Sequence, residues 1–253
     1  MNTRKHLYVA FVVAASLLLS LALAACGAAA PQTAAPAADP ASIVQSFYTL
    51  INAKKVDEAM RLTADDYVMN DPFGTYDRAG AAKQWQNVVD AGFTFEQTNF
   101  KNTDGRVTSC YLVRENGKEV DKGCNNVTHV RQGKIIFDGL ELAENIWVVQ
   151  RYYEQVNKGN IDNAATFIAD DAIFINPTGS YKGKAEIVAS LRAQAKDGLT
   201  FDLSNFREKD GRVVYNYIVK AKGDTLDKGT DGLTKVKAGK IIFDGTEKTE
   251  PAK

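Results

Sequence analysis

The sequence predicts an α+β protein of two tandem domains, each a curved antiparallel sheet wrapped by about three helices. Three observations predict this fold class. The chain repeats itself at an interval of 105 to 106 residues. Each copy opens with apolar residues at helical spacing, and each copy closes with alternating apolar residues between glycine-containing turns.

The repeat is seen in matching segments. "LTADDYVMNDPFGTY" (62–76) corresponds to "FIADDAIFINPTGSY" (167–181), and "GKIIFDG" (133–139) returns unchanged at 239–245. About half of the residues are identical towards the end of each copy, with a one-residue shift expected near 80–90. Copies of about 100 residues have the size of domains and are too long for a solenoid. We therefore expect domains at 42–141 and 142–248.

Helices are expected first in each copy. The stripe of Val44, Phe47, Tyr48 and Ile51 follows the spacing i, i+3, i+4, i+7, which marks one buried helix face, and Val149, Tyr152, Tyr153 and Val156 repeat it. Shorter helices are expected over "VDEAMRLT" and "IDNAATFI", and third helices around "AAKQWQNVVDA" and "KAEIVASLRAQA".

Strands are expected in the rest of each copy. In the first they are "FTFEQTNF", "RVTSCYLV", "GCNNVTHV" and "IIFDG". Glycine-containing turns, such as Asp104-Gly105, separate these segments, which is the pattern of an antiparallel meander.

The first 25 residues have the layout of a secretory signal, a basic head followed by the apolar run 7–24. "LAACG" (23–27) resembles the bacterial lipobox, which implies that Cys26 becomes a lipid-modified, palmitate-bearing residue. That lipid would anchor the protein to a membrane of the bacterial cell envelope, outside the cytoplasm. A retained membrane anchor and an ordinary cleaved signal with a free thiol are the alternatives.

Residues 26–41 contain Ala, Pro and other small residues and are predicted to form a tether between membrane and domain. Asp39 and Pro40, near its end, suit the cap and first position of the helix that follows. Without the signal the chain has 29 basic and 31 acidic residues, a formal charge of −2. No basic block remains, so we expect no nucleic-acid partner.

The order of elements, with "ADD" shortly before an x-Asp-Pro-x-Gly turn, resembles the nuclear transport factor 2-like (NTF2-like) superfamily. Within it, "FYTLINAKKVDEAMRLTADDYVMNDPFG" (47–74) is similar to the SnoaL-like and ketosteroid isomerase branch. This resemblance implies cone-shaped domains, each with an apolar pocket open at one end. In the isomerases an Asp of the turn moves a proton, and a Tyr and a protonated Asp stabilise the enolate oxygen.

The resemblance places the proton-moving acid at Asp71, but Phe47 stands at the tyrosine position and Asn126 at the late-strand acid. The second copy has Tyr152 at the tyrosine position, with Asn176 and Gly232 at the two acid positions. Tyr48, rotated by about 100° from Phe47, is a poor substitute. Neither copy therefore holds the complete set. The expected pocket residues are Phe47, Tyr76, Asn126, Tyr152, Asn176 and Tyr181.

Asp71 has two interpretations. Asp and Asn both cap a turn before Pro, whereas Asn cannot abstract a proton. The exchange of Asp71 for Asn176 between the copies favours the turn-forming role. A catalytic role as general base remains the alternative.

Cys110 and Cys124 lie seven residues either side of Gly117, the centre of a predicted hairpin turn. This register places them opposite each other, and in an exported protein it favours a disulfide. A redox role is the weaker alternative.

His129 is expected at the surface, and the acid pairs Asp65-Asp66 and Asp170-Asp171 are expected in loops after a helix. We expect no metal site and no cofactor.

Together these observations favour a lipid-anchored extracytoplasmic protein that binds a small, largely apolar ligand in one or both pockets, or has a structural role in the envelope. The alternative is a ketosteroid isomerase-like or polyketide cyclase-like enzyme with Asp71 as general base. Because relatives dimerise through sheet faces, the two copies are expected to form an intramolecular pseudo-dimer.

Overall fold

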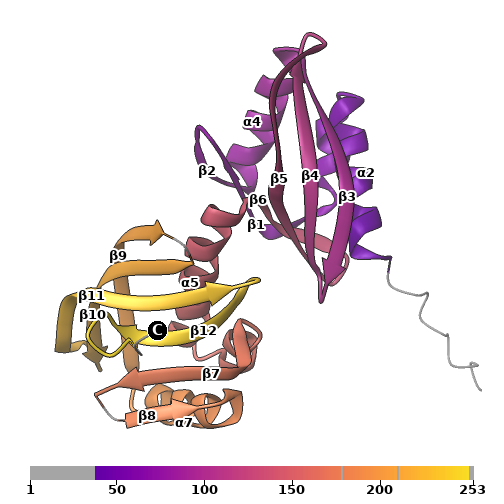
Figure 1. Ribbon diagram of the computed structural model, residues 1–253. Helices are drawn as coiled ribbons and strands as arrows, with labels where there is room; N and C mark the ends of the chain where they lie inside the picture. Colours follow the sequence, from indigo (N-terminus) through magenta and orange to yellow (C-terminus); the bar gives the residue numbers. More distant parts are fainter. Residues whose placement is uncertain (1–37, 178, 210, 251–253) are drawn as a thin grey trace, which may run out of the picture. The chain divides into compact units, whose positions relative to one another are not determined.

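The computed structural model describes residues 38–177, 179–209 and 211–250, and Figure 1 shows its two sheets with their helices. The expected signal, the lipidated Cys26 and the tether up to residue 37 lie outside the described residues. No helix within these ranges is long and apolar enough to cross a bilayer.

The first domain opens with helix α2 (Pro40–Asn52). The carboxylate of Asp39 accepts a hydrogen bond from the amide of Ser42, and Pro40 occupies the first turn. The predicted cap and helix start are therefore confirmed. The helices that follow are α3 (Val56–Met60) and α4 (Arg78–Asp90).

The first sheet has six strands in the order β2-β1-β6-β5-β4-β3. Strands β1 and β6 run parallel, and the other neighbouring strands are antiparallel. The predicted meander is confirmed in β3 to β6. The strands are β1 (Thr63–Asp71), β2 (Gly74–Asp77), β3 (Phe93–Thr103), β4 (Arg106–Glu115), β5 (Lys118–Arg131) and β6 (Lys134–Leu140).

The second domain repeats this plan, with the strand order β8-β7-β12-β11-β10-β9. Its first helix, α5, starts directly after β6. The helices are α5 (Glu141–Asn157), α6 (Ile161–Ala165) and α7 (Lys184–Lys196). The strands are β7 (Ile168–Asn176), β8 (Gly179–Lys182), β9 (Leu199–Lys209), β10 (Arg212–Ala221), β11 (Asp224–Lys237) and β12 (Lys240–Thr246).

The one-residue shift between the copies lies slightly before the expected 80–90 region. Strand β2 ends at Asp77 and α4 begins at Arg78, whereas Gly183 stands between β8 and α7. Gly183 has φ 81°, a conformation that glycine adopts without strain. In the first copy Asp77 itself caps the helix, accepting a hydrogen bond from the amide of Gly80 at 2.8 Å.

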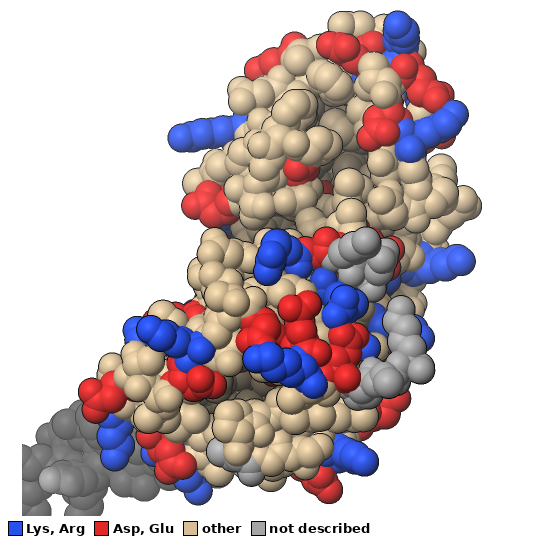
Figure 2. All heavy atoms as spheres, turned by 60° about the vertical axis from the view of Figure 1, so that its left-hand side comes forward, with Lys and Arg blue, Asp and Glu red and all other residues tan. Residues whose placement is uncertain are grey.

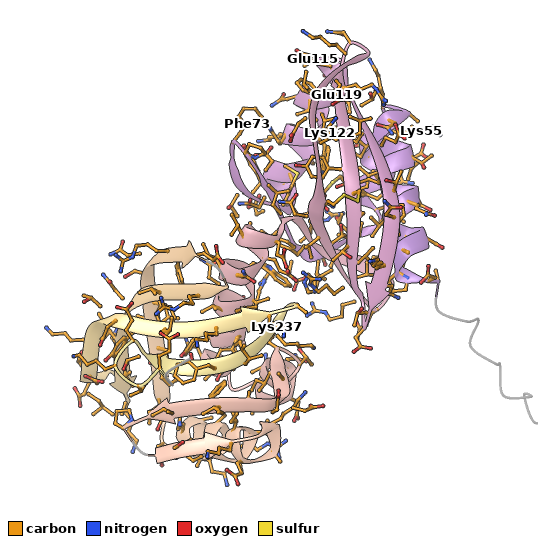
Figure 3. All side chains as sticks on the ribbon, viewed as in Figure 1. Lys55, Phe73, Glu115, Glu119, Lys122 and Lys237 are labelled. Carbon is orange, nitrogen blue, oxygen red and sulfur yellow. A yellow bond between two sulfur atoms is a disulfide. The ribbon has the colours of Figure 1, made fainter. Side chains whose placement is uncertain are left out.

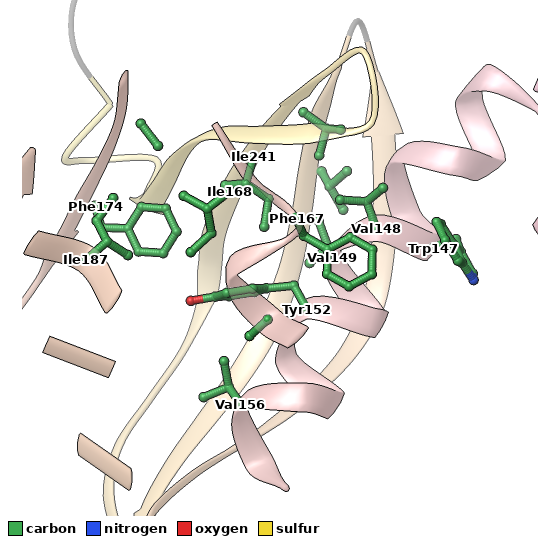
Figure 4. Packing of buried hydrophobic residues seen from close by; sticks show 14 of the residues in the cluster. Trp147, Val148, Val149, Tyr152, Val156, Phe167, Ile168, Phe174, Ile187 and Ile241 are labelled. Carbon is green, nitrogen blue, oxygen red and sulfur yellow. The ribbon is translucent and has the colours of Figure 1, made fainter. Parts of the chain in front are cut away.

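Each sheet packs one face against its helices. In the first domain the predicted α2 stripe is buried, with Phe47 and Ile51 fully covered. In the second, Val149, Tyr152 and Val156 of α5 belong to one buried cluster with apolar residues of β7, α7 and β12, and Figure 4 shows part of this cluster. Apolar burial of this kind is the main stabilising contribution in such a domain.

The acid pairs do not lie in loops as expected. Asp65 and Asp66 belong to β1, and Asp170 and Asp171 belong to β7. Only two residues separate each of these strands from the helix before it, so the expected loops are very short. Asp66 forms an ion pair with Arg131 at 2.9 Å. Among the described residues, no group of three or more His, Cys, Asp or Glu could hold a metal ion.

The predicted disulfide is present. Cys110 on β4 is bonded to Cys124 on β5, across the hairpin whose turn contains Gly117. At the equivalent positions the second domain has Asn216 and Thr230. The disulfide therefore cross-links β4 and β5 of the first sheet, and the equivalent strands of the second sheet lack this cross-link.

Candidate functional site

A cavity of about 480 Å³ lies inside the second domain. Side chains from α5, α7 and the concave face of the sheet line it, and most of them are apolar or aromatic. They include Tyr152, Phe174, Tyr181, Ile187, Leu191, Leu199, Phe201, Leu203, Tyr217 and Val219. This volume and this lining are typical of a small-molecule site.

One side of the cavity is a cluster of hydrogen-bonded polar groups around Asp244. The Tyr153 hydroxyl donates to one carboxylate oxygen at 2.8 Å, and the hydroxyls of Tyr215 and Thr234 donate to the other at 3.1 and 2.5 Å. Burial raises the pKa of Asp244, and the three hydrogen bonds offset part of this rise. These groups are paired with one another, so no ligand is needed to complete their hydrogen bonds.

The first domain contains the same arrangement around Asp138. The Tyr48 hydroxyl donates to its carboxylate at 2.8 Å, and Thr128 donates at 2.7 Å. Burial raises the pKa of Asp138 as well. However, Asp138 is only 3% exposed, whereas Asp244 is partly exposed because it borders the cavity.

Two substitutions between the copies place larger side chains in the interior of the first domain. Trp85 on α4 stands where α7 has Leu191, and Tyr67 stands where β7 has Ala172. The Trp85 ring makes edge contacts with Phe47, Tyr48 and Phe95, with centroids 5.2 to 6.0 Å apart. The interior of the first domain is therefore occupied by aromatic rings.

Three buried polar atoms of this interior make no hydrogen bond of good geometry. They are the Tyr67 hydroxyl, the Trp85 ring nitrogen and the side-chain nitrogen of Asn126. Each belongs to a side chain that is less than a tenth exposed. Burial raises the pKa of Tyr67 and of Asp138, but Trp85 lies near enough to the first, and Asn126 to the second, to offset part of this rise.

Asp71 lies at the β1–β2 hairpin and is held by its own turn. One carboxylate oxygen accepts from the amides of Phe73 and Gly74 at 2.8 and 2.9 Å, and the other accepts from Gln84 at 2.9 Å. Phe73, at the tip of this hairpin, is 79% exposed (Figure 3). Each oxygen of Asp71 thus has a hydrogen-bonding partner within the turn or on α4.

The structure separates the predicted pocket residues by domain. In the second domain, Tyr152, Asn176 and Tyr181 all line the cavity. In the first, Phe47 and Asn126 are buried in the interior, and Tyr76 packs on the edge of its core.

Our reading of the sequence missed the residues at the centre of both interiors. The pairs Tyr48 and Tyr153, Thr128 and Thr234, and Asp138 and Asp244 occupy equivalent positions. The signal was present, because both acids belong to the unchanged "GKIIFDG" segment. We set Tyr48 aside because its neighbour matches the isomerase tyrosine position, yet the helix buries both residues.

His129 is not a surface residue, contrary to expectation. Its side chain is 15% exposed, and its ring lies 4.8 Å from that of Trp147 on α5. The Nε2 atom is 2.6 Å from Glu144, which also pairs with Arg106 at 2.7 Å. Burial raises the pKa of Glu144, but hydrogen bonds and charges from His129 and Arg106 outweigh it and lower the pKa overall.

The same ion cluster occurs in the second domain. Arg212 and Lys235 occupy the positions of Arg106 and His129, and Glu250 occupies that of Glu144. Glu250 pairs with Arg212 at 2.5 Å and with Lys235 at 2.7 Å. The repeat therefore extends beyond the last strand of each domain.

Charges on the face in Figure 2 are mixed, with basic and acidic side chains interspersed over both domains. No single-sign surface of the kind that binds nucleic acid is visible there.

Two six-stranded curved sheets, each packed against its helices around a buried interior, define a tandem α+β protein of the NTF2-like class. The family model described as a SnoaL-like domain matches the chain twice, over residues 44–137 and 149–243. The chain therefore belongs to the SnoaL-like family and carries two copies of its domain.

Several solved structures are similar in fold. An NTF2-like protein of unknown function from Cytophaga hutchinsonii has 16% identity, with 40% of this chain and 88% of that chain covered and a TM-score of 0.35. An LEH-like epoxide hydrolase of M. tuberculosis has 15% identity, with 41% and 81% covered and a TM-score of 0.35. The epoxide hydrolase/cyclase-like enzyme SalBIII has 16% identity, with 41% and 89% covered and a TM-score of 0.36. No curated protein matches the chain.

Proposed function

We propose that this protein is a lipid-anchored extracytoplasmic binding protein that holds a small, largely apolar ligand in the cavity of its second domain. The observation that carries the proposal is the apolar cavity of about 480 Å³. Cavities of roughly 300–1,000 Å³ with such linings bury most of the surface of a small organic molecule.

The polar side of the cavity supports binding over proton transfer. Asp244, the acid of this cavity, accepts three hydrogen bonds, and burial raises its pKa. A raised pKa by itself makes a carboxylate a stronger base, but both oxygens of Asp244 already accept hydrogen bonds from side chains of the protein. The proposed ligand therefore contacts mainly rings and aliphatic side chains.

The enzyme alternative, with Asp71 as general base, has less support. Its carboxylate oxygens are occupied by the amides of the hairpin and by Gln84. An Asn side chain, as at position 176 of the second copy, can accept the same two amide hydrogen bonds.

The test uses a chain beginning at Ala38, because Ala38–Lys253 form one compact unit that contains both sheets and both cores. Titration with the neutral fluorescent probe N-phenyl-1-naphthylamine should show saturable binding. Leu191→Trp, which places the first domain's tryptophan in the cavity, should weaken binding by at least about tenfold.

Two further variants test whether weaker binding results from a changed cavity or from general destabilisation of the fold. Leu191→Met keeps the volume and should bind nearly as the parent does, and Trp85→Leu changes the first domain only. Equal binding by the parent and Leu191→Trp would contradict the location of the site.

Membrane attachment through Cys26 is tested in the full chain. We expect Cys26→Ser to remove incorporation of labelled palmitate and to shift the protein out of the membrane fraction. Unchanged fractionation with no label in the parent would favour a retained apolar anchor.

We also propose the intramolecular pseudo-dimer of the two repeats through their sheet faces. Crosslinks between the outer faces of the two sheets, located by mass spectrometry, are expected. Crosslinks confined to each repeat would contradict it.

A further inference from the structure

The turn that follows β12, residues Thr246–Glu250, forms part of the wall of the second-domain cavity. Thr246 and Thr249 both line the cavity. They are also joined to each other, because the Thr249 hydroxyl accepts from the Thr246 amide at 2.9 Å and donates to its carbonyl at 3.1 Å. The turn is therefore a defined structural unit that faces the ligand space.

Gly245 allows this turn to sit close to the sheet. A Cβ atom at this position would lie 2.6 Å from the Thr249 hydroxyl oxygen and 3.0 Å from the Phe243 ring. A contact of 2.6 Å is far shorter than van der Waals distance, so any side chain here would displace the turn. The amide of Glu247 further ties the turn to β11, donating to the Asp231 carbonyl at 2.8 Å.

Glu250 fastens the end of the turn. Its two carboxylate oxygens contact Arg212 at the start of β10 and Lys235 on β11, at 2.5 and 2.7 Å. The side chain of Glu250 is only 16% exposed. Hydrogen bonding to Lys235, and then to Arg212, lowers the pKa of Glu250, so it stays ionised at neutral pH.

An equivalent ion cluster of Arg106, His129 and Glu144 holds the start of α5 instead of a turn that lines the cavity. Glu144 occupies the position of Glu250 and pairs with Arg106 and His129, but it lies in the first turn of α5. There the acid holds the start of a helix of 17 residues. In the second domain the equivalent acid holds a short turn beside the cavity. This pair of sites provides a matched control within one chain.

We propose that Arg212, Lys235 and Glu250 form a latch that holds the Thr246–Glu250 turn closed over the ligand cavity, with Glu250 as the positioning residue. The inference rests on the proposed function of that cavity. Breaking the latch loosens the wall that Thr246 and Thr249 provide, so a bound apolar molecule escapes faster. Affinity then changes mainly through the dissociation rate.

The first test measures dissociation of N-phenyl-1-naphthylamine by stopped flow in the chain beginning at Ala38. Glu250→Gln should raise the dissociation rate by about tenfold. Arg212→Lys, which keeps the positive charge beside Glu250, should retain a dissociation rate close to that of the parent. Glu144→Gln breaks the equivalent cluster at the start of α5, about two turns before the cavity residues Tyr152 and Tyr153, and should raise the rate less than Glu250→Gln does.

The second test needs no ligand. Hydrogen exchange at the amides of Thr246 and Glu247 should be faster in Glu250→Gln than in the parent, and unchanged in Glu144→Gln. A parent that binds no probe contradicts the proposed function, and exchange still tests the latch. Unchanged exchange and an unchanged dissociation rate in Glu250→Gln would overturn the latch while leaving the binding site intact.

Discussion

The two domains share a fold and a polar cluster but differ in what fills their interiors. In both, a helix tyrosine and a strand threonine donate to a buried aspartate, as Tyr48 and Thr128 do to Asp138. The second domain places this cluster beside a cavity, whereas in the first domain Trp85 and Tyr67 pack near it. Duplication therefore preserved the framework, and large side chains stand at different interior positions in the two copies.

The largest effect that tests this comparison is the loss of the first domain's tryptophan. Trp85→Ala should destabilise by about 3–5 kcal/mol, because it empties a well-packed site. Leu191→Ala, at the equivalent position beside the cavity, should cost only about 2 kcal/mol. Urea unfolding of both variants measures the difference, and equal losses would show that the two interiors are packed alike.

The disulfide should distinguish the domains next. Replacing both Cys110 and Cys124 by Ser opens a cross-link that closes a loop with a sequence separation of 14 residues. Loops of this length contribute about 3 kcal/mol in chain-entropy estimates. We expect only the first domain to lose stability. Native-state hydrogen exchange should detect this loss as faster exchange of the amides of that domain. The reduced parent serves as the control and should match the double variant.

A smaller effect concerns the pH dependence of stability. Burial raises the pKa of Asp138 above its usual 3.8, so the folded state keeps a proton that the unfolded chain releases. As pH rises from 3.8 to the raised value, the parent loses stability relative to Asp138→Asn, which does not titrate.

Urea midpoints of the parent and of Asp138→Asn, measured at increasing pH from 3.8 upwards, detect this loss. Asp244→Asn should show the same sign, because burial raises the pKa of Asp244 as well. A parent that gains stability relative to Asp138→Asn over this range would contradict the raised pKa.

The smallest expected effect is that of Asp71→Asn. Asn can still accept from the amides of Phe73 and Gly74, so stability should change by less than about 0.5 kcal/mol. Probe binding in the second domain should stay the same. The reciprocal variant Asn176→Asp makes the second hairpin resemble the first. It is the matched control for Asp71→Asn. A turnover assay that Asp71→Asn abolishes, with the fold intact, would instead support the enzyme alternative.

Much of the fold could be predicted from local patterns. The buried stripe of α2, the cap at Asp39 and the meander with its Cys110–Cys124 bond follow from spacing and turn chemistry, which act over a few residues. The strand assignment of Asp65-Asp66 could not be predicted, because these residues lie in an irregular stretch of β1, between its pairings with β6 at Thr63 and Val68.

The candidate site was harder to predict, because its members are far apart in sequence. Tyr153 and Asp244 meet across 91 residues, and no local pattern links them. The buried position of His129 likewise depends on Glu144, which approaches only once α5 has docked.

The sequence by itself determined the duplication, the α+β class and the order of helices and strands, since repeats and periodicity are properties of the chain. Tertiary structure alone decided where the cavity of the second domain lies and which acids are buried. It also decided which turn lines the cavity. These outcomes depend on the volumes and hydrogen bonds of side chains brought together from distant segments, where exchanging Trp85 for Leu191 alters the space available to a ligand.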